Sequence, residues 1–401
     1  MISKKDFVNN LKNVKVVIGN GFDLHCGLKS KYSDYFNYYK RKYDYIKQWI
    51  ISFDSDVIAN RFIDRPLYEL GGDIKNFNDI NVWDFIFEIL SDEEEKDFRW
   101  CDIEDAMIDC LTNPYLDKVQ VPNQKISLTA VYKTIQNPDD DLSRCTPNFL
   151  ALVVFVMRKK EFHKFSGEDE YFEFLLNELK KFEINFGKYL KRQHDYFDNF
   201  INQHNSDYDC KAKDTLSILS NVDNIVSIDS FNYGSFGDDK LDALLRNING
   251  NLNMPIFGID TTKFKNDDAR SIFSKTNRRM ELDMLISSAY ENKEFDNVVV
   301  FGHSLSKNDY SFFFPLLDKL EMTNFSSTKK IVFAFSIFDE KKSYIIKSEH
   351  RKAINRLFAS YAVFKGYQNE PERLLDALTT QGRILTFEVP HIINDGRYFW
   401  D

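Results

Sequence analysis

The stretch Val14-Lys15-Val16-Val17-Ile18-Gly19-Asn20-Gly21-Phe22-Asp23 decides the fold class of this chain. Its first five residues form a short, mostly β-branched run that ends in glycine, which is typical of a strand buried on both faces of a parallel sheet. The glycine pair that follows allows the backbone to come close to a phosphate or a ribose, and amides ahead of a helix favour an anion. A nucleotide-binding loop and a tight structural turn are equally compatible with these residues.

This glycine pair does not form the G-x-G-x-x-G pattern of dinucleotide-binding dehydrogenases. In those enzymes an acidic residue also ends a second strand about 20 positions further on, and the chain has no such residue in that place. An ordinary dehydrogenase site is therefore disfavoured.

Strand patterns return after residue 220 and alternate with loops or helices, as expected of βαβ units. The predicted strands cover residues 224–231, 243–248, 254–259, 297–301, 330–337 and 383–389. Helices are predicted at residues 351–364 and 372–379. The sequence therefore predicts an α/β fold built on a parallel sheet.

A large helical insertion is predicted after the first strand, over residues 32–204. Within it, residues 168–204 carry apolar side chains at three- and four-residue steps, which indicates one long amphipathic helix. We favour a helix packed on its own domain over a partner-binding coiled coil. Residues 117–143, with several Pro, Asn and Asp, indicate a loop or a weakly structured connection. The predicted domains are a nucleotide-binding core, residues 1–30 and 214–401, and a helical cap, residues 31–213.

Two further turns carry polar groups after predicted strands. Asn232 follows the strand that ends near Phe231, where its amide could orient a ribose or a water, although an Asn that caps the next turn is the commoner case. Gly302-His303-Ser304 follows the strand 297–301, and Asp309 is placed to start the next helix. His303 either polarises a ribose hydroxyl or acts as a base near neutral pH, or it is a structural histidine.

A parallel sheet collects the carboxyl ends of its strands along one edge. We therefore expect the three turns near residues 20, 232 and 303 to meet and to form one cleft.

Composition limits the partners of the chain. Its 401 residues carry a net charge of −9 that is spread along the chain, which disfavours general binding to the phosphate backbone of nucleic acid. The five scattered cysteines lack the spacing of a zinc site, so we expect free thiols and no metal. No apolar leader or segment of roughly 18 apolar residues is present, so we expect a cytoplasmic protein without membrane insertion.

The ordered set of motifs resembles the AbiH family of bacteriophage abortive-infection proteins. The motifs that carry the resemblance are Ile18-Gly19-Asn20-Gly21-Phe22-Asp23-Leu24 with Gly27-Leu28, Trp100-Cys101-Asp102-Ile103-Glu104, Ser230-Phe231-Asn232-Tyr233, Phe257-Gly258-Ile259-Asp260, and Gly302-His303-Ser304-Leu305 with Asp309. They span residues 14 to about 337. The resemblance implies an anti-phage effector with a small nucleotide as ligand. A phage-derived trigger, a second defence protein or a second copy of the chain are the partners that such a role would involve.

AbiH domains are in turn similar to sirtuin-like domains, which implies a Rossmann-like, sirtuin-type sheet that binds NAD. On that similarity Gly19, Asn20, Gly21 and Phe22 form the NAD loop, with Asp23 beside it, and Asn232 is the catalytic asparagine. Gly302, Ser304 and Asp309 would complete the nucleotide site, with His303 as a catalytic group.

One departure concerns the His-Gly pair that sirtuin-like domains commonly carry after the next strand, where this chain has Asn249-Gly250. Asparagine cannot act as a base. Either His303 or His25 substitutes, or the reaction needs no base, or the protein only binds a nucleotide. The favoured hypothesis is hydrolysis of NAD at the nicotinamide–ribose bond. A nucleotide sensor without catalysis is the alternative, and a metal-dependent nuclease is the least favoured. Glu104 could reach the cleft, but an exposed helix-face carboxylate is its default interpretation.

Overall fold

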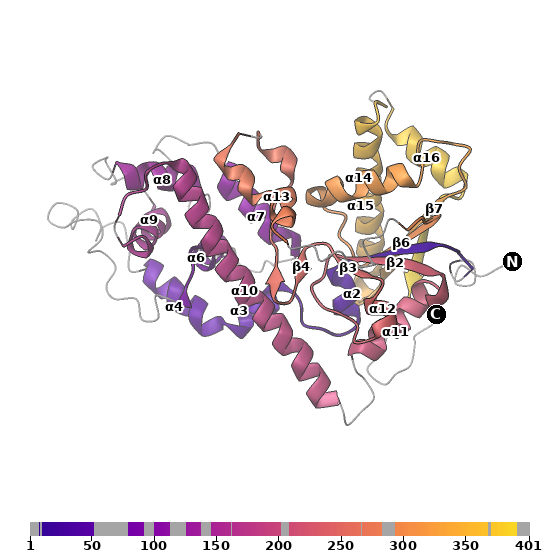
Figure 1. Ribbon diagram of the computed structural model, residues 1–401, viewed down its shortest axis with the longest axis horizontal. Helices are drawn as coiled ribbons and strands as arrows, with labels where there is room; N and C mark the ends of the chain where they lie inside the picture. Colours follow the sequence, from indigo (N-terminus) through magenta and orange to yellow (C-terminus); the bar gives the residue numbers. More distant parts are fainter. Residues whose placement is uncertain are drawn as a thin grey trace. The chain divides into compact units, whose positions relative to one another are not determined.

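The computed structural model describes residues 8, 10–51, 79–91, 100–112, 126–137, 146–161, 163–201, 208–265, 267–282, 293–367 and 370–390. The chain forms two compact units (Figure 1). The sheet unit comprises Met1–Ser30, Gly187–Pro255 and Leu282–Asp401, and the helical unit comprises Lys31–Phe186 and Ile256–Glu281. The core and cap boundaries expected from the sequence stay a prediction.

The sheet unit is built on six parallel strands in the order β3-β2-β1-β6-β7-β8. Their bounds are β1 (Val14–Ile18), β2 (Ile225–Ser230), β3 (Leu245–Asn247), β6 (Asn297–Phe301), β7 (Lys330–Ser336) and β8 (Ile384–Val389). Numbered along the chain, these strands have the order 3-2-1-4-5-6 of a doubly wound α/β sheet, and the order reverses between β1 and β6. The predicted α/β class and parallel sheet are confirmed.

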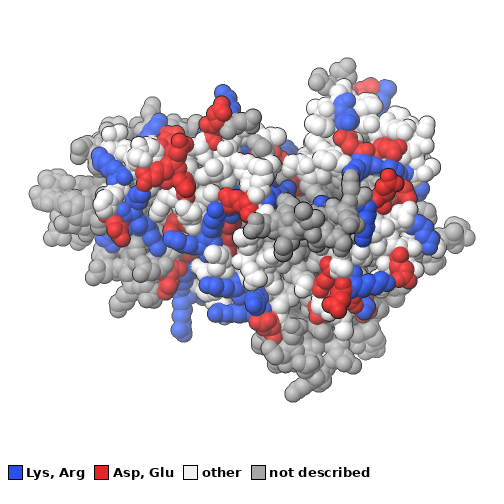
Figure 2. Space-filling view, viewed as in Figure 1, with Lys and Arg blue, Asp and Glu red and all other residues white. Residues whose placement is uncertain are grey.

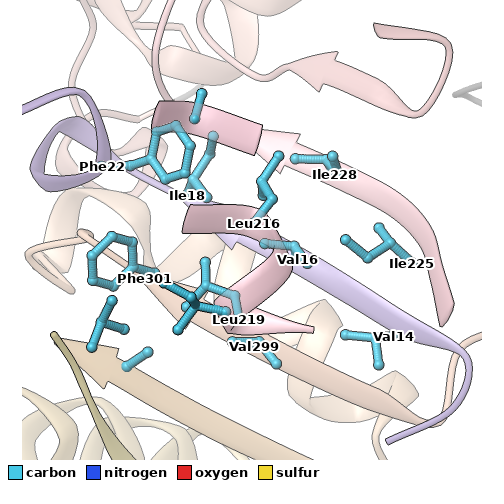
Figure 3. Packing of buried hydrophobic residues seen from close by; sticks show 14 of the residues in the cluster. Val14, Val16, Ile18, Phe22, Leu216, Leu219, Ile225, Ile228, Val299 and Phe301 are labelled. Atoms are coloured by element: carbon cyan, nitrogen blue, oxygen red, sulfur yellow. The ribbon is translucent and has the colours of Figure 1, made fainter. Parts of the chain in front are cut away.

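Two apolar clusters cover the two faces of this sheet, because successive side chains of a strand point to opposite faces. Val14, Val16 and Ile18 belong to one cluster and Val17 to the other. The first cluster packs against Phe22 of α2 (Asn20–His25) and against α11 (Tyr208–Leu219), as Figure 3 shows for Leu216 and Leu219. All five residues of β1 and of β6 are buried, which explains why both runs are apolar apart from Lys15 and Asn297.

The second face is covered by three helices that follow the strands of the carboxyl-terminal half. They are α14 (Tyr310–Lys319), α15 (Ser343–Phe364) and α16 (Glu372–Thr380), and their buried residues belong to the second cluster. Both helices predicted near the carboxyl terminus are confirmed, although α15 begins eight residues before the predicted residue 351. A short helix, α12 (Asp239–Asp242), connects β2 and β3.

The helical unit confirms the long helical insertion after β1. Its helices are α3 (Tyr32–Tyr38), α4 (Lys40–Ile51), α6 (Val82–Ser91), α7 (Trp100–Thr112), α8 (Leu128–Gln136), α9 (Pro147–Lys159) and α13 (Lys275–Met280), together with the first part of α10 (Glu168–Ile201). The predicted long helix is thus a single helix of 34 residues. Its residues Leu175, Leu179 and Phe182 are buried in this unit, which favours the packed helix over an exposed coiled coil.

Two predictions are wrong in part. Within residues 117–143, predicted as a loop, Leu128–Gln136 form α8, because Ser127 caps the helix and its apolar face is buried. The rest of that range lies outside the described residues, apart from residues 126, 127 and 137.

The second partly wrong prediction is the strand at residues 254–259. Only β5 (Met254–Pro255) is formed, and it pairs antiparallel with β4 (Gly250–Asn251) in a small hairpin apart from the main sheet. Gly250 has a φ of +87°, which suits a tight hairpin. Pro255 has no N–H group to donate to a sheet, which limits the strand. Ile259 instead forms an isolated bridge with Ser274.

Two buried ion pairs hold α13 in the helical unit. Lys275 Nζ lies 2.8 Å from a carboxylate oxygen of Glu104 on α7, and Arg278 lies 2.5 Å from Glu183 on α10. All four side chains are at most 4% exposed. Glu183 also accepts a hydrogen bond from the Phe257 amide. The carboxylate of Glu104 is therefore not the exposed helix-face group expected by default.

Replacing Arg278 with methionine should lower the free energy of unfolding by about 3–5 kcal/mol, because it leaves the buried Glu183 carboxylate without its cation. Urea denaturation of the purified protein measures the change. The Arg373→Met variant is the control, since Arg373 and Glu370 form an exposed pair and its loss should cost less than about 1 kcal/mol. If both variants lose the same free energy of unfolding, the buried ion pair contributes no more to stability than the exposed one.

Candidate functional site

The turns after β1 and β6 are in direct backbone contact. The Gly19 amide donates to the Phe301 carbonyl at 3.1 Å, and the Gly21 amide donates to the Gly302 carbonyl at 2.8 Å. A Cβ on Gly21 would lie 2.7 Å from the Gly302 Cα, and a Cβ on Gly302 would lie 2.2 Å from the Phe22 nitrogen. Glycine is therefore required at both positions by the close approach of two backbones at the point where the strand order reverses.

The amides of the glycine loop are used within the protein. Besides Gly19 and Gly21, the Phe22 amide donates to the Gly19 carbonyl at 2.8 Å, and Phe22 itself is buried in the core. These amides are bonded in the structure and so do not point toward a phosphate. Asn20 is half-buried, and its Oδ1 accepts a hydrogen bond from the Ser30 hydroxyl at 2.5 Å. The half-buried part of the loop consists of Asn20 and Gly21.

Asn232 connects the turn after β2 to the glycine loop. Its Nδ2 donates to the Gly19 carbonyl at 3.1 Å, and its own amide donates to the Ser230 hydroxyl at 3.0 Å. The preceding residue, Phe231, donates its amide to the Ile18 carbonyl. Asn232 is only 5% exposed. The turns after β1, β2 and β6 thus meet, as expected from the sequence, whereas the cleft expected between them stays a prediction.

Asp23 is buried behind Asn232. Its Oδ1 accepts a hydrogen bond of 2.6 Å from the hydroxyl of Tyr208 on α11, and its carboxyl is also hydrogen-bonded to the Asn232 side chain. Burial raises the pKa of Asp23 to about 7, and the bonds from Tyr208 and Asn232 act in the opposite direction. Both charge states of this carboxyl are therefore populated near neutral pH.

The raised pKa of Asp23 predicts a pH-dependent stability. Between the unfolded value of 3.8 and the folded value of about 7, the folded state binds more protons, so the free energy of unfolding falls as the pH rises and then levels off above 7. In the Asp23→Asn variant this contribution is absent. We expect the free energy of unfolding of the variant, relative to that of the wild type, to be about 3 kcal/mol more favourable at pH 8 than at pH 5.

Urea denaturation of both proteins at the two pH values measures this difference, and the effects of all other titrating groups cancel in the comparison. If the two proteins differ in their free energy of unfolding by the same amount at pH 5 and at pH 8, Asp23 ionises at an ordinary pKa.

His303 is held in its turn by a hydrogen bond to one ring nitrogen and lies near a carboxylate with the other. Nδ1 accepts a hydrogen bond from the Leu305 amide at 2.9 Å, so the proton of the neutral ring is on Nε2, which lies 3.6 Å from Asp309 Oδ2. The ring packs edge-on against Phe231, with 4.3 Å between ring centroids. Because the Nδ1 lone pair is engaged, His303 is better suited to fixing the turn than to accepting a proton from a substrate.

The remaining predicted residues lie around this turn. Gly302 has a φ of +69° and is half-buried, Ser304 is exposed, and Asp309 is buried. His25, the alternative base, is buried with its ring edge-on against Phe301. Asn249, at the place of the expected histidine, is also buried. All of the residues predicted for the site therefore lie in the sheet unit.

Tyr208 and His194 are residues of the site that the sequence did not reveal. The Tyr208 hydroxyl bonds to Asp23, and the His194 ring packs edge-on against the Tyr208 ring at 4.8 Å. Both fall in residues 31–213, which the sequence analysis assigned to the helical cap, and neither belongs to a recognisable motif. Only the periodicity of the helices around them was visible.

Glu104, in contrast, was singled out by the sequence but is not among the residues of the candidate site. Its motif was visible in the sequence, and the structure pairs its carboxylate with Lys275 in the helical unit.

A metal-binding cluster and a membrane-spanning helix are both absent from the described ranges. No group of three or more His, Cys, Asp and Glu side chains there could hold a metal ion. None of the helices described is both long and apolar enough to cross a membrane. Among the described residues, Cys26, Cys110 and Cys210 form no disulfide bond, whereas the Cys101 side chain and Cys145 lie outside the described part. On the face shown in Figure 2, Lys and Arg alternate with Asp and Glu.

Fold and site together define a doubly wound α/β protein with polar groups gathered at the point where its strand order reverses. Residues 16–330 match the family model described as bacteriophage abortive infection AbiH. The chain belongs to this family and is therefore an abortive-infection protein. Comparisons with curated proteins and with solved structures gave no match.

Proposed function

We propose that this abortive-infection protein binds NAD or a related nucleotide at the carboxyl ends of β1, β2 and β6 and hydrolyses its nicotinamide–ribose bond. The observation that carries the proposal is the joining of three turns where the strand order reverses, with the Asn232 amide bonded to the glycine loop and the Asp23 carboxyl behind it. Open α/β sheets bind their ligands at this point. The motif resemblance to sirtuin-like domains supports NAD as the nucleotide.

In the proposed reaction the bond between ribose C1′ and the nicotinamide nitrogen breaks, and nicotinamide leaves as a neutral molecule. A water oxygen forms the new bond to C1′, and the proton of that water is released to solvent, which gives ADP-ribose. Asn232 positions the water through Oδ1, because its Nδ2 is fixed by Gly19. Ionised Asp23 stabilises the positive charge that builds up on the ribose as the bond breaks.

The glycine loop has a steric role in this proposal. The amides of Gly19, Gly21 and Phe22 are bonded within the protein, so they do not form an amide cradle, and the absence of side chains at Gly19 and Gly21 lets the turn after β6 pack against the loop. Asn20, Gly21, Gly302 and Ser304 are half-buried or exposed and would form the contact surface. Asp309 acts through His303, which it helps to hold in the turn.

Incubation of the purified full-length chain with NAD tests the proposal. Chromatography should show nicotinamide and ADP-ribose appearing in equal amounts. A parallel incubation with NADP and with ATP identifies a related nucleotide as the substrate. If none of these nucleotides is consumed under conditions in which the protein is folded, hydrolysis is not its function.

A nucleotide sensor is the second candidate, and the geometry of the histidines favours it. His303 uses Nδ1 to accept a backbone hydrogen bond, and Asn249 stands where a histidine was expected, so neither supplies a general base. Calorimetry with NAD and with ADP-ribose separates the two candidates when it is run beside the turnover assay. Tight binding without product would support the sensor.

A further inference from the structure

We infer that Tyr208 is a positioning residue of the site, which sets the charge of Asp23 and thereby the pH range in which the protein works. This inference rests on the proposed function, because it assigns a task to Asp23. Its structural part, that the Tyr208 hydroxyl controls the ionisation of Asp23, can be tested without any turnover.

The geometry of the Tyr208–Asp23 contact carries the inference. The hydroxyl donates to Asp23 Oδ1 over 2.6 Å, a length typical of a hydrogen bond from a hydroxyl to an ionised carboxylate. Tyr208 is 2% exposed and Asp23 is 5% exposed, so water does not compete effectively for the carboxyl. In such surroundings each hydrogen bond to the charged form has a large influence on ionisation.

The Tyr208 ring is fixed from two sides, so its hydroxyl has a defined direction. Tyr208 belongs to the apolar cluster of the sheet face together with Ala212 and Leu216 of α11. On another side the His194 ring of α10 packs edge-on against it. His194 also limits the turn after β2, since a Cβ on Gly234 would lie 2.8 Å from His194 Nε2. Helices α10 and α11 therefore fix the donor that acts on Asp23.

The other titratable groups around this contact do not replace Tyr208. Burial raises the pKa of the Cys26 thiol on the same side of α2 well above neutral, so this thiol stays uncharged. Burial also raises the pKa of Tyr208 itself, which keeps its proton available for donation. Burial lowers the pKa of His194 to about 4, so His194 is neutral at working pH. The charge of Asp209 raises the pKa of Tyr208, and the charge of Lys211 lowers the pKa of Cys26. Both charges therefore act on neighbours of the Asp23 carboxyl.

The Tyr208→Phe variant tests the inference, because it removes the hydroxyl and keeps the ring. Loss of one hydrogen bond to the carboxylate should raise the pKa of Asp23 by about one to two pH units. NMR titration of the chain labelled with ¹³C at the aspartate carboxyls measures this pKa, and the Asp23→Asn variant assigns the signal. The pH midpoint of NAD hydrolysis should move upward by the same amount, with kcat at pH 7 reduced about tenfold and KM unchanged.

The Tyr189→Phe variant is the matched control. Tyr189 is also buried in the sheet unit, but its hydroxyl donates to the Lys29 carbonyl at 2.8 Å and not to Asp23. Its loss should leave the pKa of Asp23 where it is in the wild type. Site-specific 3-fluorotyrosine at position 208 gives a test of the opposite sign. Its more acidic hydroxyl is a stronger donor, so the pKa of Asp23 should fall.

Three outcomes separate the inference from the proposed function. Shifts of opposite sign at position 208, with none at position 189, support the inference even where NAD is not consumed. An Asp23 signal that titrates identically in all variants overturns it, even where NAD is hydrolysed. A tenfold loss of activity in Tyr208→Phe without any displacement of the pH profile also overturns it, since a purely structural role would give that result.

Discussion

NAD hydrolysis should fall at least ~100-fold in the Asn232→Ala variant, which is the effect of removing one positioned polar group from a catalytic site. The Asn232 side chain links the turn after β2 to the segment after β1, through its bonds to the Gly19 carbonyl and to Asp23. In the proposed mechanism the attacking water would have no fixed acceptor without this side chain. The initial rate of nicotinamide release at saturating NAD measures the loss.

Asn224→Ala is the matched control, because Asn224 precedes β2 at its amino end whereas Asn232 follows the same strand at its carboxyl end. Its Oδ1 accepts a hydrogen bond from Lys12 on the surface, so the control also loses one side-chain bond. Circular dichroism should show both variants folded. An Asn232→Ala protein that is folded and still turns over NAD at the wild-type rate would remove Asn232 from the mechanism.

Gly302→Ala should be strongly destabilising, with a loss of about 5 kcal/mol or more in the free energy of unfolding. The added Cβ would lie 2.2 Å from the Phe22 nitrogen and 2.6 Å from the Gly21 carbonyl carbon, and backbone atoms cannot rotate away as a side chain can. Gly302 also has a φ of +69°, which disfavours a residue with a Cβ. Urea denaturation, or the yield of folded protein, measures the effect.

Gly366→Ala separates the two causes of that loss. Gly366 has a φ of +92°, but a Cβ there would meet no heavy atom of the described structure within 4 Å. Its substitution should therefore cost only the backbone strain, about 1–2 kcal/mol. If Gly302→Ala costs no more than Gly366→Ala, the two turns are not packed against each other as described, and the site loses its central contact.

The sequence predicted the elements whose signal is local. β1 and β6 coincide with their predicted bounds, since short, mostly β-branched runs that end in glycine favour a buried strand. The long helix α10 was visible from the spacing of its apolar residues. The strand predicted at residues 254–259 is wrong in part because Ile256, Phe257 and Ile259 belong to the helical unit and are buried there, and not in the main sheet.

The meeting of the three turns was predicted from the sequence, whereas the hydrogen bonding of their polar groups was not. The three turns could be placed at one edge because a parallel sheet imposes that arrangement. The engaged nitrogens of His303 could not be foreseen, since they depend on a backbone amide two residues away and on the position of Asp309. The use of the loop amides by Phe301 and Gly302 likewise follows from the contact of two separate turns.

The sequence by itself determined that this chain has an α/β fold with a helical insertion, and it identified glycine, asparagine and histidine turns at the ends of three strands. Only the tertiary structure decided which groups can act there. Asn232 meets Gly19 across 213 positions of the chain, and Tyr208 meets Asp23 across 185. The physical reason is that charge and hydrogen bonding depend on burial and on neighbours in space, and neither is encoded in any short stretch of residues.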